Sequence, residues 1–242
     1  MKTIKSLLLI SSFLVMCVTL NAQEKIQSPE HNEIMASLIK NEAYEMNWFA
    51  FRDTVKIEIG KVFTTISKTK NTLKVTTTVK MKDKPDWVDE TIAELPELKP
   101  VRHTSVNTQR DITLNFGKQT TGFYLDKTGN KKTEINENTD GDFFDSNLYP
   151  QLIRWLPLKE NYKTEITIFD YNPMTKAGIM KANITNTTKG IYMNKSVWIV
   201  TVTDGISQNK VINTYYIDSE TNQFLKQEID MGTRKMTLEK AY

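Results

Sequence analysis

The chain has 242 residues, with 32 lysine or arginine residues against 29 aspartate or glutamate residues and a formal net charge of +3. Because the charges are balanced and form no basic run interleaved with aromatic residues, the composition argues against a nucleic-acid-binding protein. The only cysteine, Cys17, lies in an apolar segment near the N-terminus, which excludes a disulfide, a cysteine metal site and thiol chemistry from the rest of the chain.

Residues 1–22 have the pattern of a secretory signal peptide. Lys2 and Lys5 precede an apolar run over residues 7–20, and we expect cleavage after Ala22. This run is shorter than the about 20 apolar residues that span a bilayer, and no later segment is longer. Cys17 lacks the small preceding residue of a lipidation motif. We therefore expect an exported, soluble, periplasmic protein without a lipid anchor.

Residues 23–242 are expected to form a single domain, since all-β sheets of this length commonly do so. Its first predicted element is a helix over about residues 29–46. The segment Ser28-Pro29-Glu30 combines a hydroxyl cap with a proline and an acid in the first turn. Apolar residues at 35, 38 and 39 then mark one face of this helix.

Most of the remaining sequence alternates apolar and polar residues with the period of two that strands with one buried face show. Segments with this pattern lie at 54–59, 73–81, 112–116, 121–125, 166–168, 180–184, 197–200, 211–217, 224–231 and 234–238. Their short connections favour an antiparallel meander over parallel crossover units. The fold class is therefore predicted to be mainly β, a single antiparallel sheet with a few short helices.

The strand pattern breaks at residues 85–100. Val88, Ile92 and Leu95 recur there at helical spacing, which predicts a short acidic connector helix. This connector either packs at the rim of the sheet or, with Trp87, closes over the sheet as a lid.

A second helix is predicted at residues 148–156. Pro150 fits a first helical turn, and Pro157 ends the helix because its ring excludes the preceding carbonyl group. Arg154 lies off the apolar stripe of this helix and is expected to pair with a carboxylate or with water at the rim in preference to a lipid head group. The stripe consists of Leu148, Leu152, Trp155 and Leu156.

Several segments resemble the exported domain family of unknown function numbered 3108, from about Thr54 to the C-terminus. They are residues 143–158, Phe169-Asp170-Tyr171 and Tyr215-Tyr216-Ile217-Asp218. That family is similar in fold to the bacterial lipoprotein carriers LolA and LolB, where a strongly curved antiparallel sheet forms an unclosed half-barrel with helices on its concave face. In those carriers the concave space receives lipid acyl chains. The resemblance therefore implies a half-barrel and lipid binding, and it implies no catalytic residue.

In such a half-barrel, the helix at 148–156 either fills the concave space as core or lines a cavity for a hydrophobic ligand. If it lines a cavity, the sequence predicts one set of ligand-binding residues from this helix and the connector. They are Leu148, Leu152, Trp155, Leu156 and Trp87.

The loop at 136–147 resembles a calcium-binding loop, because oxygen-bearing side chains alternate along it and Gly141 is its sixth residue. Asn136 and Asn147 stand where such a loop needs its first and last acidic ligands. A polar hairpin loop, with Asp145 capping the following helix, is therefore favoured, and no metal is predicted.

No catalytic motif is present, and His31 and His103 are interpreted as separate surface residues. The sequence thus predicts a non-enzymatic envelope protein without a cofactor, which binds a lipid or another hydrophobic ligand. The alternatives are a structural or partner-binding protein with a filled interior and a calcium-binding module.

Overall fold

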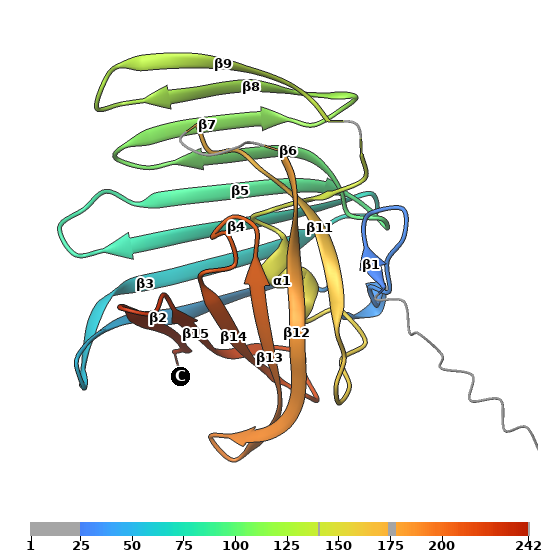
Figure 1. Cartoon of the computed structure of the whole chain (residues 1–242), viewed down its shortest axis with the longest axis vertical. Coiled ribbons are helices and arrows are strands. Elements are labelled where there is room, and N and C mark those ends of the chain that lie inside the picture. Colours follow the sequence, from blue (N-terminus) through green and yellow to red (C-terminus); the bar gives the residue numbers. More distant parts are fainter. Residues whose placement is uncertain (1–24, 140, 174–177, 242) are drawn as a thin grey trace, which may run out of the picture.

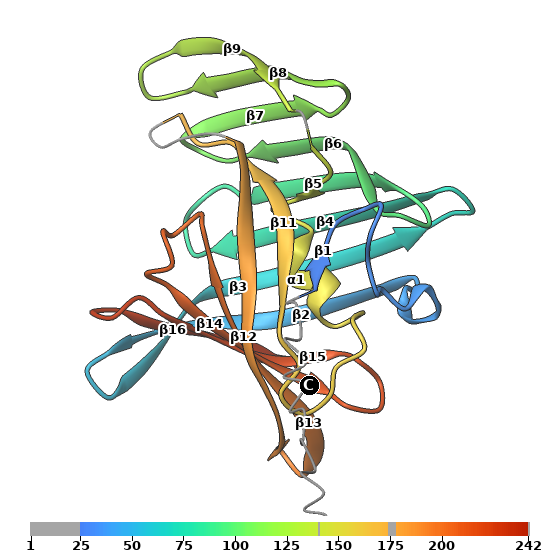
Figure 2. The same ribbon diagram turned by 45° about the vertical axis from the view of Figure 1, so that its right-hand side comes forward.

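The computed structural model describes residues 25–139, 141–173 and 178–241. Within these residues, 16 strands form one sheet. Figures 1 and 2 show that this sheet does not close on itself. The sheet ends at β1 (Ile26–Gln27) on one edge and at β9 (Lys131–Asn138) on the other. The expected fold class, a mainly β protein with one unclosed antiparallel sheet, is confirmed.

Two antiparallel meanders, which we call the first and second arms, make up the sheet. The first arm contains β2 (Glu42–Arg52), β3 (Val55–Lys68), β4 (Thr72–Met81), β5 (Trp87–Glu94), β6 (Lys99–Val106), β7 (Arg110–Asn115), β8 (Gln119–Asp126) and β9. The second arm contains β11 (Thr164–Asp170), β12 (Gly178–Tyr192), β13 (Lys195–Asp204), β14 (Ile212–Asp218), β15 (Phe224–Asp230) and β16 (Lys235–Lys240).

The two arms join where β2 pairs antiparallel with β16. The short strands β1 and β10 (Phe144–Asp145) instead pair in parallel with β11. In Figures 1 and 2 the second arm crosses the first at a steep angle, with the short helix α1 (Tyr149–Ile153) between them. The segment that connects the arms therefore occupies the concave side of the sheet.

The predicted helix over residues 29–46 is wrong. Ser28 and His31 form an isolated bridge, a 3-10 helix covers Ala36–Leu38, and β2 begins at Glu42. Tyr44, Met46 and Trp48 alternate along β2 toward the concave side, a pattern with the period of a strand. Pairing with β3 on one side and β16 on the other satisfies the backbone of β2, so the capping signal at residue 28 is overridden.

The predicted connector helix at 85–100 is also wrong, because this segment forms β5 and β6 with a turn between them. Val88 and Ile92 are four residues apart, a spacing that places two side chains on one face of either a helix or a strand. Thr91 and Ala93 distinguish a strand from a helix here. Both are 1% exposed, and they occupy alternate positions of β5, as residues on the buried face of a strand do. Since Trp87 belongs to a paired strand, the lid interpretation is excluded.

The helix expected at 148–156 is present but shorter, since α1 covers Tyr149–Ile153 and Pro150 lies in its first turn as predicted. Leu148 precedes the helix, and the residues after it continue as a turn. All four stripe residues are at most 1% exposed and belong to the main hydrophobic core with strands of both arms. They are Leu148, Leu152, Trp155 and Leu156.

Arg154 fastens the end of α1 to both arms and is itself only 2% exposed. Its guanidinium group donates hydrogen bonds to the Glu42 carboxylate of β2 and to the backbone oxygen of Asn222, which precedes β15. It also lies 5.4 Å from the centre of the Phe224 ring. The expected pairing of Arg154 with a carboxylate is therefore observed, and the buried charge has polar partners as burial requires.

Replacing Leu152 with alanine should test how much the filled concave side stabilises the fold. Truncation of a fully buried leucine leaves a cavity, so we expect the free energy of unfolding in urea to fall by about 2–5 kcal/mol. Ile191→Ala is the control: Ile191 is 81% exposed, and its truncation should change stability by about 0.5 kcal/mol or less. Equal effects of the two variants would contradict the placement of α1 in the core.

Candidate functional site

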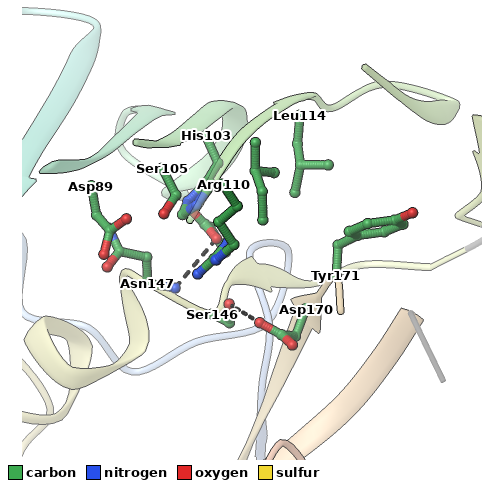
Figure 3. A pocket seen from close by; sticks show the side chains of 11 residues that line it. Asp89, His103, Ser105, Arg110, Leu114, Ser146, Asn147, Asp170 and Tyr171 are labelled. Atoms are coloured by element: carbon green, nitrogen blue, oxygen red, sulfur yellow. Dashed lines mark hydrogen bonds and ion pairs between the residues drawn. The ribbon is translucent and has the colours of Figure 1, made fainter. Parts of the chain in front are cut away.

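A polar pocket of about 150 Å³ lies where β5, β6 and β7 face β10, the residues after it and the end of β11. Figure 3 shows Asp89 and Ser105 on one side and Asp170 and Tyr171 on the other, with Arg110 between them. The polar side chains that line this pocket are Asp89, His103, Ser105, Arg110, Asp145, Ser146, Asn147, Asp170 and Tyr171.

A buried histidine–aspartate pair forms the back of the polar pocket. His103 Nδ1 lies 2.9 Å from Asp145 Oδ2, and these residues are 9% and 1% exposed. Thr91 Oγ1 donates to the same carboxylate oxygen. The other ring nitrogen of His103, Nε2, has no hydrogen-bond partner in the part of the chain that the structure describes. Because Asp145 holds Nδ1, this second nitrogen remains available to the pocket.

These contacts correct two expectations from the sequence. His103 is buried on β6, not a surface residue. Asp145 does not cap α1, because the residue at the N-cap position, Leu148, has no side-chain cap. Its Oδ2 instead contacts Thr91 of β5 and His103 of β6, and its Oδ1 accepts the backbone N–H of Asn147. The alternation along β6, in which the buried His103 and Ser105 flank the outward Thr104, was the available signal. It could not be used without knowing which face of β6 is covered.

Charge around His103 sets its protonation. Burial by itself lowers the pKa of the imidazole, but the adjacent Asp145 charge and hydrogen bond outweigh burial. The carboxylates of Asp89 on β5 and Asp170 on β11 act in the same direction, so the pKa of His103 is raised. Arg110 of β7 is the other charged residue of the pocket wall.

Asp170 supplies a second carboxylate with unusual surroundings. Its Oδ1 accepts a hydrogen bond of 2.9 Å from Ser146 Oγ, visible as a dashed line in Figure 3. Burial raises the pKa of Asp170, and the negative charge of Asp145 adds to this effect. The hydrogen bond from Ser146 and the charges of His103 and Arg110 oppose it without cancelling it. Burial is thus the main reason that the pKa of Asp170 is raised.

An apolar cavity of about 220 Å³ lies on the concave side, between α1 and strands of both arms. Asn147, Pro150 and Gln151 form its α1 side, and residues of β2, β3, β4, β14, β15 and β16 form the rest. The Trp48 indole N–H in its wall is buried and has no partner among the described residues. Its apolar lining residues are Met46, Trp48, Val62, Val79, Pro150, Phe224, Ile229 and Leu238.

The residues predicted to bind a ligand lie elsewhere. The four α1 stripe residues, Leu148, Leu152, Trp155 and Leu156, line neither the apolar cavity nor the polar pocket. Trp87 donates its indole N–H to Asp89 Oδ1 at 2.8 Å and to Ser105 Oγ at 3.2 Å. Trp87 therefore positions two polar-pocket residues instead of covering the concave side.

The residues of the calcium-like loop at 136–147 do not converge on one point but make separate contacts. Asn136 and Asn138 belong to β9, where they pair with Thr121 and Gln119. Asp142 accepts the backbone N–H of Glu30 at 2.7 Å. Glu137 also belongs to β9, where it pairs with Thr120, and the acidic residue at position 140 lies outside the described residues. Among the residues that the structure does describe, no group of three or more His, Cys, Asp or Glu side chains could hold a metal ion.

Comparison with known proteins identifies the family. Residues 43–239 match DUF3108, a family described as a protein of unknown function. The chain belongs to the DUF3108 family. This resemblance, expected from the sequence, is confirmed, and the match runs from β2 to β16, so this DUF3108 segment comprises both arms of the sheet.

Among solved structures, this DUF3108 protein is similar to a β-barrel-like protein from Brucella abortus with the domain of unknown function DUF1849. The TM-score is 0.48 at 10% sequence identity, over 84% of this chain and 96% of that one. No curated protein sequence matches the chain.

His103→Asn should change how stability depends on pH. Histidine in an unfolded chain has a pKa of about 6.5, and the folded-state pKa of His103 is higher, so the native state keeps its proton to higher pH. The stability from charged His103 is complete below about pH 6.5 and is lost as the pH rises through the folded-state pKa. We therefore expect the difference in unfolding free energy between wild type and variant to shrink as the pH rises above about 6.5.

Urea denaturation at a series of pH values measures this difference. Asparagine can still donate to Asp145, which limits loss of packing in the variant. The exposed His31→Asn variant controls for removal of a histidine as such. A stability difference that is the same at every pH would show that the His103–Asp145 pair is not a titrating ion pair.

Proposed function

We propose that this DUF3108 protein is a non-enzymatic binding protein of the cell envelope that holds a hydrophobic group in the apolar cavity. The observation that carries the proposal is the cavity itself, which is walled by apolar side chains from both arms and bordered by α1. Binding sites for small molecules are typically concave and mostly apolar, with a few polar groups that set orientation.

The size and lining of the cavity support an apolar ligand. The cavity of about 220 Å³ is partly open to solvent, and its wall combines Trp48 and Phe224 with aliphatic residues. Such a wall suits part of an acyl chain, because transfer of each methylene group from water contributes about 0.8 kcal/mol.

The proposal keeps the expected ligand class but moves the binding residues. The wall of the site is supplied by alternate residues of paired strands: Met46 pairs with Val62, and Val62 pairs with Val79. The apolar stripe of α1 packs behind the site, while Pro150 and Gln151 face it.

One observation favours the alternative of a structural or partner-binding protein with a filled interior. The apolar stripe of α1 is buried to 1% exposure or less, so a large part of the concave side is core. A small half-barrel with such an insert can be stable without a ligand. The two candidates differ in whether the remaining 220 Å³ takes up an apolar molecule.

Placement in the envelope is part of the proposal and is supported by the sequence alone. Lys2 and Lys5 before the apolar run at 7–20, with Ala22 at the expected cleavage site, have the order of a secretory leader. These residues lie outside the described part of the chain. No described helix has the length and apolar character needed to cross a bilayer.

Filling the cavity should abolish uptake of an apolar probe. We expect the neutral dye N-phenylnaphthylamine to bind the purified protein saturably, with increased fluorescence. Val62→Phe should weaken binding by about tenfold or more, because the added ring occupies the space of the probe. Val55→Phe, the same substitution at a 59% exposed position of β3, is the control and should bind like wild type.

Organic extraction of protein purified without detergent, followed by mass spectrometry, provides an independent measurement. A co-purifying amphiphile that is lost in Val62→Phe would support the proposal. Absence of both dye binding and a co-purifying amphiphile would reject it in favour of the filled, structural protein.

A further inference from the structure

The apolar cavity and the polar pocket are neighbours on the same side of the sheet. Asn147 lines both of them. A row of directly paired residues also runs across the strands from the apolar cavity to the polar pocket. It starts at Tyr44 and Thr64 in the cavity wall, passes through Thr77, and continues to Asp89 and Ser105 in the pocket wall. Paired residues on one face of a sheet lie about 5 Å apart, so a single molecule can contact both spaces.

The polar pocket has more negative than positive charge. Two cationic side chains, His103 and Arg110, face the three carboxylates of Asp89, Asp145 and Asp170. His103 is already paired with Asp145. Arg110 makes no ion pair with any described residue, and it is left to balance two carboxylates by itself. A deficit of positive charge therefore remains in the pocket.

Hydrogen-bonding capacity in the pocket is also unused. Asp89 Oδ1 accepts from Trp87, and Asp170 Oδ1 accepts from Ser146, but the second carboxylate oxygen of each has no partner among the described residues. His103, which is 9% exposed, borders the same space, and its Nε2, an N–H donor while the ring is charged, is likewise unpartnered within the described chain. Partly buried polar atoms of this kind gain from a partner that replaces lost water.

Building on the proposed function, we propose that the two spaces form one binding site for an amphiphile whose head group carries an ammonium. The apolar chain lies in the cavity beside Trp48 and Val62. The ammonium passes Asn147 and donates to the free oxygens of Asp89 and Asp170.

An ammonium group suits this pocket better than an anion or a neutral head. It brings the missing positive charge and three N–H donors to two carboxylates with free acceptor oxygens. A carboxylate head would meet Arg110 but would also lie against Asp89 and Asp170, and like charges in a partly buried site repel. A hydroxyl head would supply one donor and no charge. The pocket volume of about 150 Å³ accommodates a head group of a few heavy atoms.

Competition with the dye by amphiphiles of equal chain length tests this inference. Decylammonium, decanol and decanoate are titrated at pH 7 against N-phenylnaphthylamine bound to the wild-type protein. We expect decylammonium to bind at least about tenfold more tightly than either of the others, with an advantage that falls as salt is added. A zwitterionic lysophosphatidylethanolamine, added as a fourth competitor, distinguishes a lipid head group from a simple amine as the source of the ammonium.

Single substitutions then locate the head group. Asp170→Asn and Asp89→Asn should each reduce the ratio of decylammonium to decanol affinity by about tenfold. Asp86→Asn removes the same charge at an exposed turn before β5 and should retain the wild-type ratio. Circular dichroism identifies a variant that fails to fold, and the comparison of head groups on wild type requires no variant.

The outcomes separate the two proposals. If no decyl compound displaces the dye and the dye itself does not bind, the hydrophobic site fails and this inference fails with it. If all three displace the dye equally, the cavity binds apolar chains but the polar pocket is not a head-group site. Preference for decanoate, or loss of the ammonium preference in Asp86→Asn, would also overturn the assignment.

Discussion

The pairing of β2 with β16 is the constraint on which the architecture depends. It joins the first long strand of the chain to the last one and turns two separate meanders into one sheet. The same pair builds the wall of the apolar cavity, because Leu238 of β16 lies directly opposite Trp48 of β2 and both side chains line it. The family match begins in β2 and ends in β16, so the segment that defines DUF3108 is the segment that this pair encloses.

The connection between the arms uses the space that the sheet leaves open. Its apolar residues pack in the core, while three of its polar side chains form hydrogen bonds with strands of both arms. Asp145 contacts β5 and β6, Arg154 contacts β2, and Tyr149 donates a hydrogen bond of 2.8 Å to Asp204 at the end of β13. Burial raises the pKa of the Tyr149 phenol strongly, so this group remains a neutral donor. A five-residue helix with few internal hydrogen bonds is stabilised by these contacts more than by its own propensity.

The sequence predicted most of the fold because period-two patterning directly reports a strand with one covered face. It failed where a pattern was compatible with two structures. Val88 and Ile92 share a face in a helix and in a strand alike, and only pairing with β4 and β6 decides between them. At the N-terminus, a local capping signal suggested a helix that the alternating aromatic residues of β2 and its two partner strands exclude.

The candidate site was harder to predict, because its residues come together from distant parts of the chain. His103 and Asp145 are 42 positions apart, and no local sequence pattern connects them. The apolar stripe of α1 was visible in the sequence, but its amphipathic pattern shows only that a face is buried. Whether that face contacts core or ligand depends on the volume that the opposite strands leave free. A local sequence pattern gives no information about this volume.

The β2–β16 pair also determines the order in which the molecule can be assembled. Hairpins within each arm need only local contacts, whereas the central pair joins β2 to β16, which follows every other described strand in the sequence. Until β16 is available, β2 presents an unpaired edge that carries Trp48 and Phe49, and such edges are templates for pairing between chains. Until β16 pairs with it, β2 therefore exposes the wall of the apolar cavity as an open strand edge, and a chain that lacks β16 keeps this edge exposed.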